Sequence, residues 1–561
     1  MSTAFRDLPY ERPSLDAITA AARAGLAAWD AATTAEQQIA LITRWDQEQI
    51  ALYTLRALAG IHFAQDTKDA SSRDEKTFFD TIRPDIDGLN LEFLRRVTSS
   101  AHREALTAHF GAQALALWDL QLTTFDPRVS DHKRKIAALN NAYDELRASI
   151  RVPFRGESHT LSTIRAFFGD ADRATRQEAL QAQATALSEH AEAFDRLYDE
   201  LVAVRHDMAT QLGFPDATTL AYASLGRTDY GPDDVAAFRK QVREVVLSLV
   251  RKIHARRART LGLERYDFED ESVRDSLGSP RPAGDHDWMM QQASGMFDAM
   301  GEDFGAFFAM MRDQDLMDLK SRDAKVGGGF CEALSAHRVP FIFANFNGTQ
   351  GDVQVFTHEC GHAFQYYSSR DLALRDYFWP TLEACEIHSM GLEYLSFPHM
   401  ERFFGPEADR YRVAHVEDSI LFLAYGCTVD EFQHRVYAEP NLTPDERAAV
   451  WTELEATYLP NRTYAGMPYF AEGRYWQRQG HIYHEPFYYI DYCLAQVCAL
   501  QLWRRATEDR DATMALYRRL CSLGGKLPFT KLLAEVGLDN PFRPGCLEGV
   551  VEHVEGWLGL E

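Results

Sequence analysis

The apolar residues near the start of the chain are spaced as in amphipathic helices. Between Ser14 and Leu58 they recur three or four positions apart, for example at Ile18, Ala22 and Leu26. This spacing places apolar side chains on one face of a helix, where they can be buried. The same spacing predicts further helices over 91–121, 132–150, 172–212, 233–257, 406–437 and 443–457.

Three segments interrupt this helical pattern. The stretch 149–162 has a Phe-Arg-Gly-Glu turn signal between two short β-prone runs, which predicts a hairpin. The aromatic and β-branched run Val339–Phe346 predicts a strand, and such a strand beside a cleft could pair with an extended peptide. The glycines at 327–329 before it predict a turn. Prolines, glycines and aromatic residues at 458–492 predict a functional loop.

Polar residues predict where two helices begin. Asp131 is a candidate start cap for the helix at 132–150. Thr349-Gln-Gly-Asp352 has the form of a capping box, in which both side chains satisfy free backbone N–H groups. We therefore expect a helix to begin just after Thr349.

Length and composition restrict the class of protein. A chain of 561 residues is too long for one compact unit of usual size, so two lobes are expected. The 83 acidic and 59 basic residues give a formal charge of −24, which disfavours nucleic acid or an anionic membrane as a partner. No apolar run has the length of a signal peptide core or a membrane span, so we expect a cytoplasmic protein. The eight cysteines form no Cys-x-x-Cys pair, which favours reduced thiols.

The helix that begins near residue 350 carries the chemistry. His358 and His362 lie four positions apart, so both imidazoles can reach one zinc ion from the same helical face. Glu359 lies about 100° further round the helix, where it can act as a general base without being a ligand. Cys360 points away from this face and is expected to be a packed thiol.

A catalytic zinc site has three protein ligands and an open position, so a third ligand is needed. The segment 381–393 has the pattern of a second helix, and it offers Glu383, Glu386, His388 and Glu393 as candidates. Glu386 and Glu393 are seven apart and share a face, so one can bind zinc while the other supports a ligand. Glu383, one turn before Glu386, competes for the same role.

Hydrogen-bond donors near the C-terminus could stabilise an oxyanion. Tyr489 and Tyr492 face the same way if they are helical, and His481 precedes them. Two neighbours compete for these roles, His484 with His481 and Tyr488 with Tyr489.

The segment His358-Glu-Cys-Gly-His362-Ala-Phe-Gln365, followed by Glu386-Ile-His-Ser389 and Glu393, resembles the thimet oligopeptidase family of zinc metallopeptidases. The similarity is to its oligoendopeptidase F and Pz-peptidase branch. In that family the third zinc ligand is the glutamate three residues before a serine on the second helix, which implies Glu386 here. Further similar segments are Lys325–Cys331, Pro340–Thr349, Gly480–His481 and Pro486–Tyr492.

The resemblance implies a mostly α-helical fold, a two-lobed clamshell around a deep substrate channel, with a small β-sheet beside the zinc helix. We expect an N-terminal helical lobe at 1–200, including the hairpin near 149–162, and a catalytic region at 201–561. The resemblance also assigns contacts with the substrate and the transition state to His481, Tyr489 and Tyr492.

These features predict a zinc-dependent metalloendopeptidase that hydrolyses internal bonds of short peptides. One Zn²⁺ per chain would be held by His358, His362 and Glu386, and Glu359 would activate the attacking water. No nucleic acid or membrane partner is expected, and the sequence does not indicate an oligomeric state.

Two alternatives remain open. A carboxypeptidase or dipeptidyl carboxypeptidase on a similar helical fold would need a cation for the substrate's terminal carboxylate, and Arg462, Arg474 and Arg478 are candidates. A zinc-stabilised peptide-binding protein without turnover is the weaker alternative, because a binder has no use for Glu359 as a base.

Overall fold

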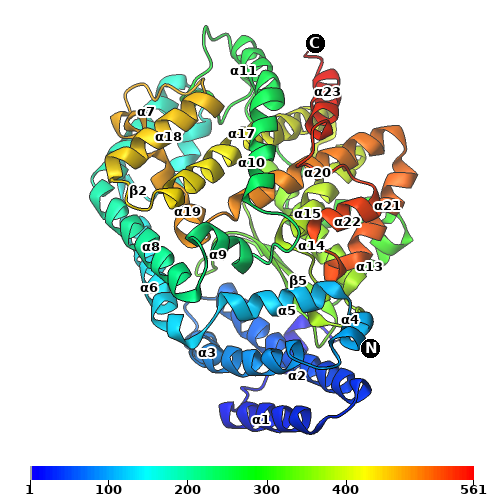
Figure 1. The fold of residues 1–561 in the computed structure, drawn as a ribbon. Coiled ribbons are helices and arrows are strands. Elements are labelled where there is room, and N and C mark those ends of the chain that lie inside the picture. The colour runs from blue at the N-terminus through cyan, green and yellow to red at the C-terminus, as the bar shows by residue number, and fades with distance from the viewer. Residues whose placement is uncertain (1–2, 561) are drawn as a thin grey trace. The chain divides into compact units, whose positions relative to one another are not determined.

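The computed structural model describes residues 3–560, and they fold mostly into helices (Figure 1). They form two compact units, each assembled from three separate segments. This confirms the predicted mostly helical fold with two lobes. The boundary of these units does not coincide with a single division of the chain at residue 200. The first unit comprises the chain up to Leu122, Pro280–Asp409 and Cys498–Leu538, and the second comprises Thr123–Ser279, Arg410–Val497 and the chain from Asp539 on.

The N-terminal helices of the first unit pack on one another through a buried apolar core. Trp45 stacks on Phe93 with ring centroids 4.2 Å apart, and Leu26 is buried in the same core. Thr34 and Gln37 form a capping box that fixes the start of the second helix. The helices are α1 Leu15–Ala31, α2 Ala35–Gln65, α3 Ala70–Thr98, α4 Arg103–Phe110 and α5 Ala112–Thr124.

A three-stranded sheet also belongs to the first unit. It consists of β3 Met317–Lys320, β4 Phe330–Leu334 and β5 Val339–Phe346, in the order β3-β5-β4. The strand predicted at Val339–Phe346 is therefore confirmed. Our expectation that it pairs with a peptide is wrong, because β3 occupies one of its edges in parallel and β4 the other in antiparallel.

Helix α14, Gln350–Ser369, follows this sheet directly and packs on β5 and on α15, Leu382–Leu395. The predicted capping box at its start is wrong. Thr349 is the N-cap residue but makes no side-chain cap bond, and Asp352 instead accepts hydrogen bonds from the N–H groups of Asn347 and Gly348. The other helices of this unit are α12 His286–Met300, α13 Glu302–Asp313, α16 Glu401–Phe404, α21 Arg510–Leu523 and α22 Phe529–Val536.

The second unit contains the predicted hairpin, formed by β1 Val152–Phe154 and β2 Glu157–His159. Asp131 does not cap the preceding helix, because that helix already begins at Ser130. A short 3₁₀ turn capped by Asp126 leads directly into it. The helices are α6 Ser130–Ser149, α7 Arg173–Ser188, α8 Ala191–Leu212, α9 Ala217–Ser224, α10 Pro232–Gln241, α11 Leu247–Leu261, α18 Pro444–Tyr458, α19 Gly480–His484 and α23 Cys546–Leu558. Helix α17 Ala408–Ala438 belongs to this unit from Arg410 on, and α20 Tyr489–Glu508 belongs to it only up to Val497.

Aromatic packing positions α19 within the second unit. Tyr483 stacks on Tyr143 with ring centroids 3.9 Å apart and also lies against Trp476. The 458–492 segment, predicted as a loop, is thus largely ordered into short helical turns with buried aromatic rings. In the described part of the chain, no helix has the length and apolarity needed to cross a membrane.

Candidate metal centre

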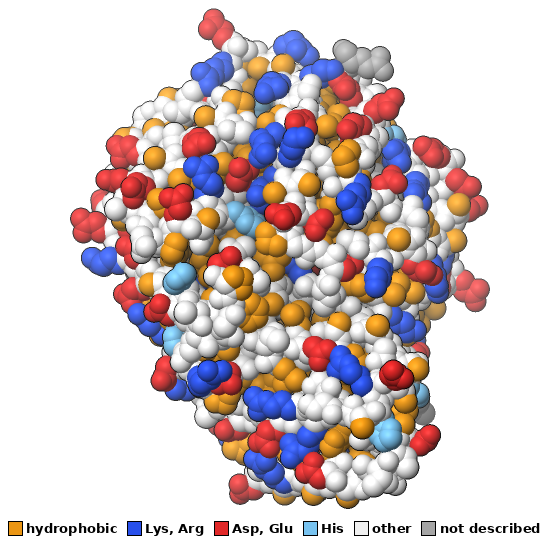
Figure 2. Space-filling view, viewed as in Figure 1, with side chains coloured by type: hydrophobic (Ala, Val, Ile, Leu, Met, Phe, Trp, Pro, Cys, Tyr) orange, Lys and Arg blue, Asp and Glu red, His pale blue; other side chains and the backbone are white. Residues whose placement is uncertain are grey.

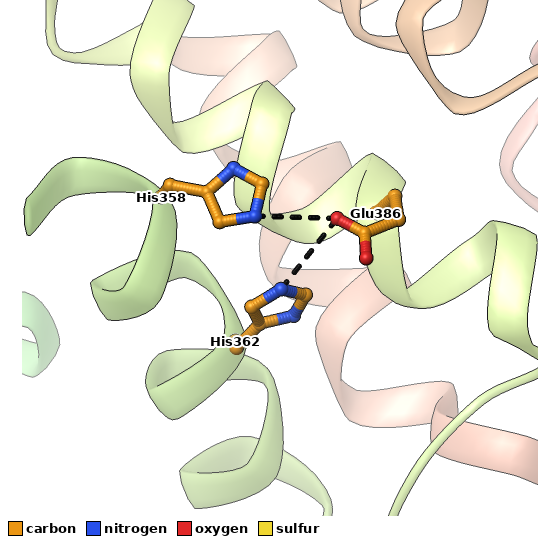
Figure 3. Close-up of side chains that lie close together, drawn as sticks. All are labelled: His358, His362 and Glu386. Carbon is orange, nitrogen blue, oxygen red and sulfur yellow. Dashed lines mark ion pairs between the residues drawn. The ribbon is translucent and has the colours of Figure 1, made fainter. Parts of the chain in front are cut away.

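Helices α14 and α15 bring three side chains together from separate parts of the sequence. The Nε2 atoms of His358 and His362 lie 3.3 Å and 3.6 Å from Oε2 of Glu386, and the three side chains point toward one another in Figure 3. One donor atom from each residue lies within 4.8 Å of the others. Two imidazoles and one carboxylate are a ligand set typical of catalytic zinc. The donor set therefore fits a metal ion.

A close approach of the two helices makes this meeting possible. A Cβ atom at Gly361 would lie 2.5 Å from the carbonyl oxygen of His388 and 2.6 Å from Cα of Ser389. Only glycine leaves room for this contact between α14 and α15. The glycine in the motif therefore sets the distance between the histidines and Glu386.

Hydrogen bonds hold these ligands in place. Nδ1 of His358 lies 2.7 Å from Oε1 of Glu393, which turns its Nε2 toward Glu386. The Ser389 hydroxyl donates to Glu386 Oε2 over 3.0 Å. Glu393 thus has the supporting position that the sequence left open between Glu386 and Glu393.

Charge and burial distinguish the two histidines. Burial opposes protonation of His358, but its bonds to Glu386 and Glu393 outweigh burial and raise its pKa well above the usual value. Burial lowers the pKa of His362 to about 4, so this imidazole stays neutral at pH 7. Burial also acts on Glu386, but His362 and His358 outweigh it and lower the carboxyl pKa to about 2.

Glu359 lies beside this group with an unused oxygen. The residue is 7% exposed, and its buried Oε2 has no hydrogen-bond partner among residues 3–560. Burial is the main cause that raises its pKa to about 7, Glu386 and Glu393 add to the rise, and His358 opposes it. Gly329, just before β4, lies close to this carboxylate. A Cβ atom added at Gly329 would be 3.5 Å from Glu359 Oε1. A buried carboxylate with such a pKa can take and return a proton near neutral pH.

The remaining candidates on these two helices do not belong to the group of possible metal ligands. Glu383 is buried on α15 but is not part of the group formed by the two histidines and Glu386. Cys360 is fully buried, as predicted for a packed thiol. His388 is also fully buried, and its Nδ1 lies 2.6 Å from the carbonyl oxygen of Ala384.

The predicted oxyanion donors form a separate cluster within the second unit. The ring of His481 lies 5.0 Å from that of Tyr489 and 6.0 Å from that of Tyr492, between centroids. Burial raises the pKa of Tyr489 well above its usual value, so its hydroxyl keeps a proton to donate. Nε2 of His484 lies 3.0 Å from Oδ1 of Asp144. Tyr488 adjoins the cluster, 6.2 Å from His481.

The three candidate arginines differ in their partners. Arg462 and Arg474 are each paired with two carboxylates. The guanidinium of Arg478 instead lies 4.5 Å from the ring centroid of Tyr475, and it forms no ion pair with a residue that the structure describes. The carboxylate partners are Glu271 and Glu455 for Arg462, and Asp195 and Asp445 for Arg474.

Two family models match the sequence, the peptidase M3 N-terminal domain over residues 5–125 and peptidase family M3 over residues 296–551. A solved structure of Pz peptidase A with an inhibitor has 40% identity and a TM-score of 0.93, with 99% of each chain covered. A structure assigned as oligoendopeptidase F has 43% identity and a TM-score of 0.93, covering 100% of this chain and 99% of that one. A second structure assigned as oligoendopeptidase F, from Bacillus anthracis strain Ames, has 37% identity and a TM-score of 0.88. The match covers 100% of this chain and 98% of that one. The search of curated proteins found no match.

The helical fold and these full-length similarities define a metallopeptidase. The chain belongs to peptidase family M3, in the branch of Pz peptidase and oligoendopeptidase F. The predicted family, fold class and enzyme class are thus confirmed.

Proposed function

We propose that this metallopeptidase is a zinc-dependent endopeptidase that cleaves internal bonds of short peptides. The observation that carries this proposal is the convergence of His358, His362 and Glu386 beside the free carboxylate oxygen of Glu359. When bound to these ligands, zinc supplies Lewis-acid chemistry, polarising a peptide carbonyl and lowering the pKa of water to about 7.

The protein's own groups divide the remaining work. Glu359 takes a proton from the attacking water and later delivers it to the leaving amine. Its burial supports this role, because a carboxylate with a pKa near 7 both accepts and releases protons at neutral pH. Glu393 keeps the His358 imidazole oriented through the 2.7 Å bond to Nδ1.

We assign substrate binding to the edge of β4. Within the described sheet this strand pairs with β5 on one side only, and the chain just before it passes close to Glu359 at Gly329. An extended peptide that adds to this edge would form backbone hydrogen bonds, which tolerate many sequences. Such binding suits a peptidase of short, unfolded substrates.

The resemblance supports a role for His481, Tyr489 and Tyr492 as donors to the substrate and to the developing oxyanion. Their grouping around one imidazole and the protonated state of Tyr489 are consistent with that role. Localisation in the cytoplasm remains a proposal, supported by eight cysteines that form no disulfide among the described residues.

Two internally quenched peptides of one sequence test the proposal, one blocked at both ends and one with a free C-terminus. An endopeptidase cleaves both, and removal of metal by a chelator abolishes both activities. Cleavage of only the free peptide would indicate a carboxypeptidase. Binding without cleavage, with zinc present in stoichiometric amount, would indicate a peptide-binding protein.

A further inference from the structure

Hydrogen bonding in the three-stranded sheet decides which main-chain groups of β4 face outward. Ile342 of β5 donates its N–H toward the β3 side, to the carbonyl oxygen just before that strand. Main-chain groups of successive residues point to opposite sides of a strand, so Phe343 turns toward β4, where it is paired with Phe330. The main-chain groups of Phe330 are therefore bonded to β5. Those of Gly329 and Cys331, on either side of Phe330, point to the outer edge of β4.

The free part of this outer edge is short. Gly329 is exposed, and in the described chain its N–H and C=O groups form no main-chain hydrogen bond. Cys331 faces the same edge, where the described sheet has no further strand. The next outward N–H, that of Ala333, donates instead to the Glu332 carboxylate over 3.0 Å. The edge therefore offers an extended peptide the main chain of Gly329 and Cys331, and the Glu332 side chain limits it beyond them.

Asn345 of β5 holds the segment that leads into this edge. Its Nδ2 donates to the carbonyl oxygens of Val326 and Gly328, each over 2.8 Å. The glycines 327–329 are exposed, and glycine loses more conformational freedom on ordering than any other residue. Contacts from a fixed side chain are therefore needed to keep this segment in one conformation. Asn345 supplies two such contacts just before Gly329.

The ammonium group of Lys325 anchors the start of the same segment. The pairing of β3 with β5 shifts register between Asp318 and Lys320, which disrupts the ladder there. At this shift Nζ donates to three carbonyl oxygens, those of Asp318 at 2.9 Å, Lys320 at 3.0 Å and Ala344 at 2.6 Å. The Asp318 carboxylate lies 2.9 Å from the same atom, and the lysine side chain is 0% exposed. The ammonium group is thus used inside the sheet and does not act as a surface charge.

We propose that Asn345 and Lys325 are positioning residues for peptide binding. They hold the glycine segment so that the main chain of Gly329 and Cys331 pairs with the substrate beside Glu359. A Cβ atom at Gly329 would lie 3.5 Å from Glu359 Oε1, so a peptide paired there passes next to the base. All of these residues lie within one segment of the first unit, Pro280–Asp409. The inference rests on the proposed function, which places the peptide at this edge.

A series of N-methylated peptides tests the two-residue edge. One labelled peptide, blocked at both ends, is prepared with a single main-chain N–H replaced by N–CH₃ at each position in turn. Fluorescence anisotropy with zinc-loaded Glu359→Gln measures each affinity without turnover. Alternate residues of a strand face the same edge, so two positions that are two residues apart should each lose roughly 2–10-fold in affinity. The position between them should tolerate the methyl group, and a scan without this spacing would refute the edge.

Asn345→Asp tests the positioning role, because it keeps the shape of the side chain but cannot donate to the two carbonyl oxygens of the segment. In the Glu359→Gln background it should abolish the penalty at the N-methyl position that pairs with Gly329 and keep the penalty at the other, at unchanged zinc affinity. A merely structural role would weaken every peptide by the same factor, and that result would overturn the proposal. Asn90→Asp makes the same change on α3, where Oδ1 accepts the Trp45 indole N–H, and as the matched control it should keep both penalties.

Lys325→Met is the second variant, since it keeps the aliphatic stem and removes the ammonium group. Provided that circular dichroism shows it to be folded, it should abolish the same penalty as Asn345→Asp. A folded Lys325→Met protein that keeps both penalties would overturn the role of Lys325. Because buried acceptors lose their donor in this variant, Asn345→Asp decides the proposal if Lys325→Met does not fold.

Cleavage assays separate this inference from the proposed function. If zinc-loaded wild type cleaves the blocked peptide while the Glu359→Gln form binds all N-methylated peptides equally, the two-residue edge is refuted and the proposed function stands. If wild type cleaves no peptide, the proposed function fails, while the affinities in the Glu359→Gln form still decide how the peptide is held.

Discussion

Glu386 and Glu383 lie one helical turn apart on α15, and helical spacing alone could not decide between them as zinc ligand. The family pattern, a glutamate three residues before Ser389, favoured Glu386. In the structure, Glu386 Oε2 accepts the Ser389 hydroxyl and faces both histidines. Which glutamate faces the histidines depends on how α15 is rotated about its own axis relative to α14. The packing of the two helices sets that rotation.

We therefore expect Glu386→Gln to weaken zinc binding far more than Glu383→Gln, because only the first removes a charged donor from the group. Zinc titration of the two variants, with circular dichroism to confirm folding, measures the difference. Equal losses would contradict the assigned ligand set.

Protons should compete with zinc for His358. Glu386 and Glu393 raise its pKa, so the metal-free site holds a proton there that zinc binding must release. Apparent zinc affinity should therefore fall as the pH falls, by up to roughly tenfold per unit for one released proton. Titrations at pH 6, 7 and 8 would measure this slope, and an affinity independent of pH would argue against a proton on His358.

Tyr489 and Tyr492 should act mainly in the transition state, when the carbonyl oxygen gains charge. Replacing the oxyanion donor by phenylalanine removes one hydroxyl and keeps the ring, so kcat should fall by about 10²–10³ with little change in KM. Steady-state kinetics of both variants at equal zinc content identify the donor. Full kcat in both would mean that these tyrosines only line the site.

At the level of elements, the approach of α14 to α15 at Gly361 controls the geometry of the centre. In Gly361→Ala the added methyl would meet the α15 backbone at 2.5–2.6 Å, so the helices must separate. We expect a loss of about 1–3 kcal/mol in stability and weaker zinc binding. Thermal unfolding and zinc titration measure both effects.

Gly351→Ala is the control for that variant, because it lies on the same helix and its Cβ would meet only Thr349 Oγ1 at 3.5 Å. It should change neither zinc affinity nor stability by a comparable amount. If Gly361→Ala behaves like this control, close helix packing does not determine the site.

Helices and strands with a strong local pattern could be predicted from the sequence. The distant elements on which they pack, and the residues with which they pair, could not. The hairpin near 149–162 and the strand Val339–Phe346 are present as expected. An acidic run at 264–275 follows Arg257 closely in the sequence. Arg257 is instead buried and pairs with Glu417 and Asp418 of α17, about 160 positions away. Apolar spacing predicts which residues are helical but carries no information on which helices meet.

The same limit applies to helix starts. Asp352 was expected to bond to the N–H of Thr349, but its carboxylate accepts from Asn347 and Gly348 instead. A capping motif in sequence indicates that backbone N–H groups need acceptors, and the path of the preceding loop decides which N–H groups come within reach.

At the level of the whole molecule, the two compact units are each built from three segments, so no single boundary in the sequence separates them. The predicted division at residue 200 used local patterns, whereas the units arise because C-terminal helices such as α21 pack on α14. The three residues of the candidate metal centre lie within 29 positions of one another, and the sequence alone indicated them.

Surface charge could be predicted as a total but not as a distribution. Acidic and basic side chains are interspersed on the face in Figure 2. The formal charge of −24 therefore gives the balance between acidic and basic side chains but not where each kind lies.

The central claim is that zinc held by His358, His362 and Glu386 acts together with Glu359 as the base. The most direct measurement compares wild type with Glu359→Gln after both have been stripped of metal and loaded with one equivalent of zinc. We expect equal zinc content and affinity, with hydrolysis of a peptide blocked at both ends lost only in Glu359→Gln. Undiminished hydrolysis by the variant, or loss of its zinc, would contradict the role of Glu359 as a base that does not bind the metal.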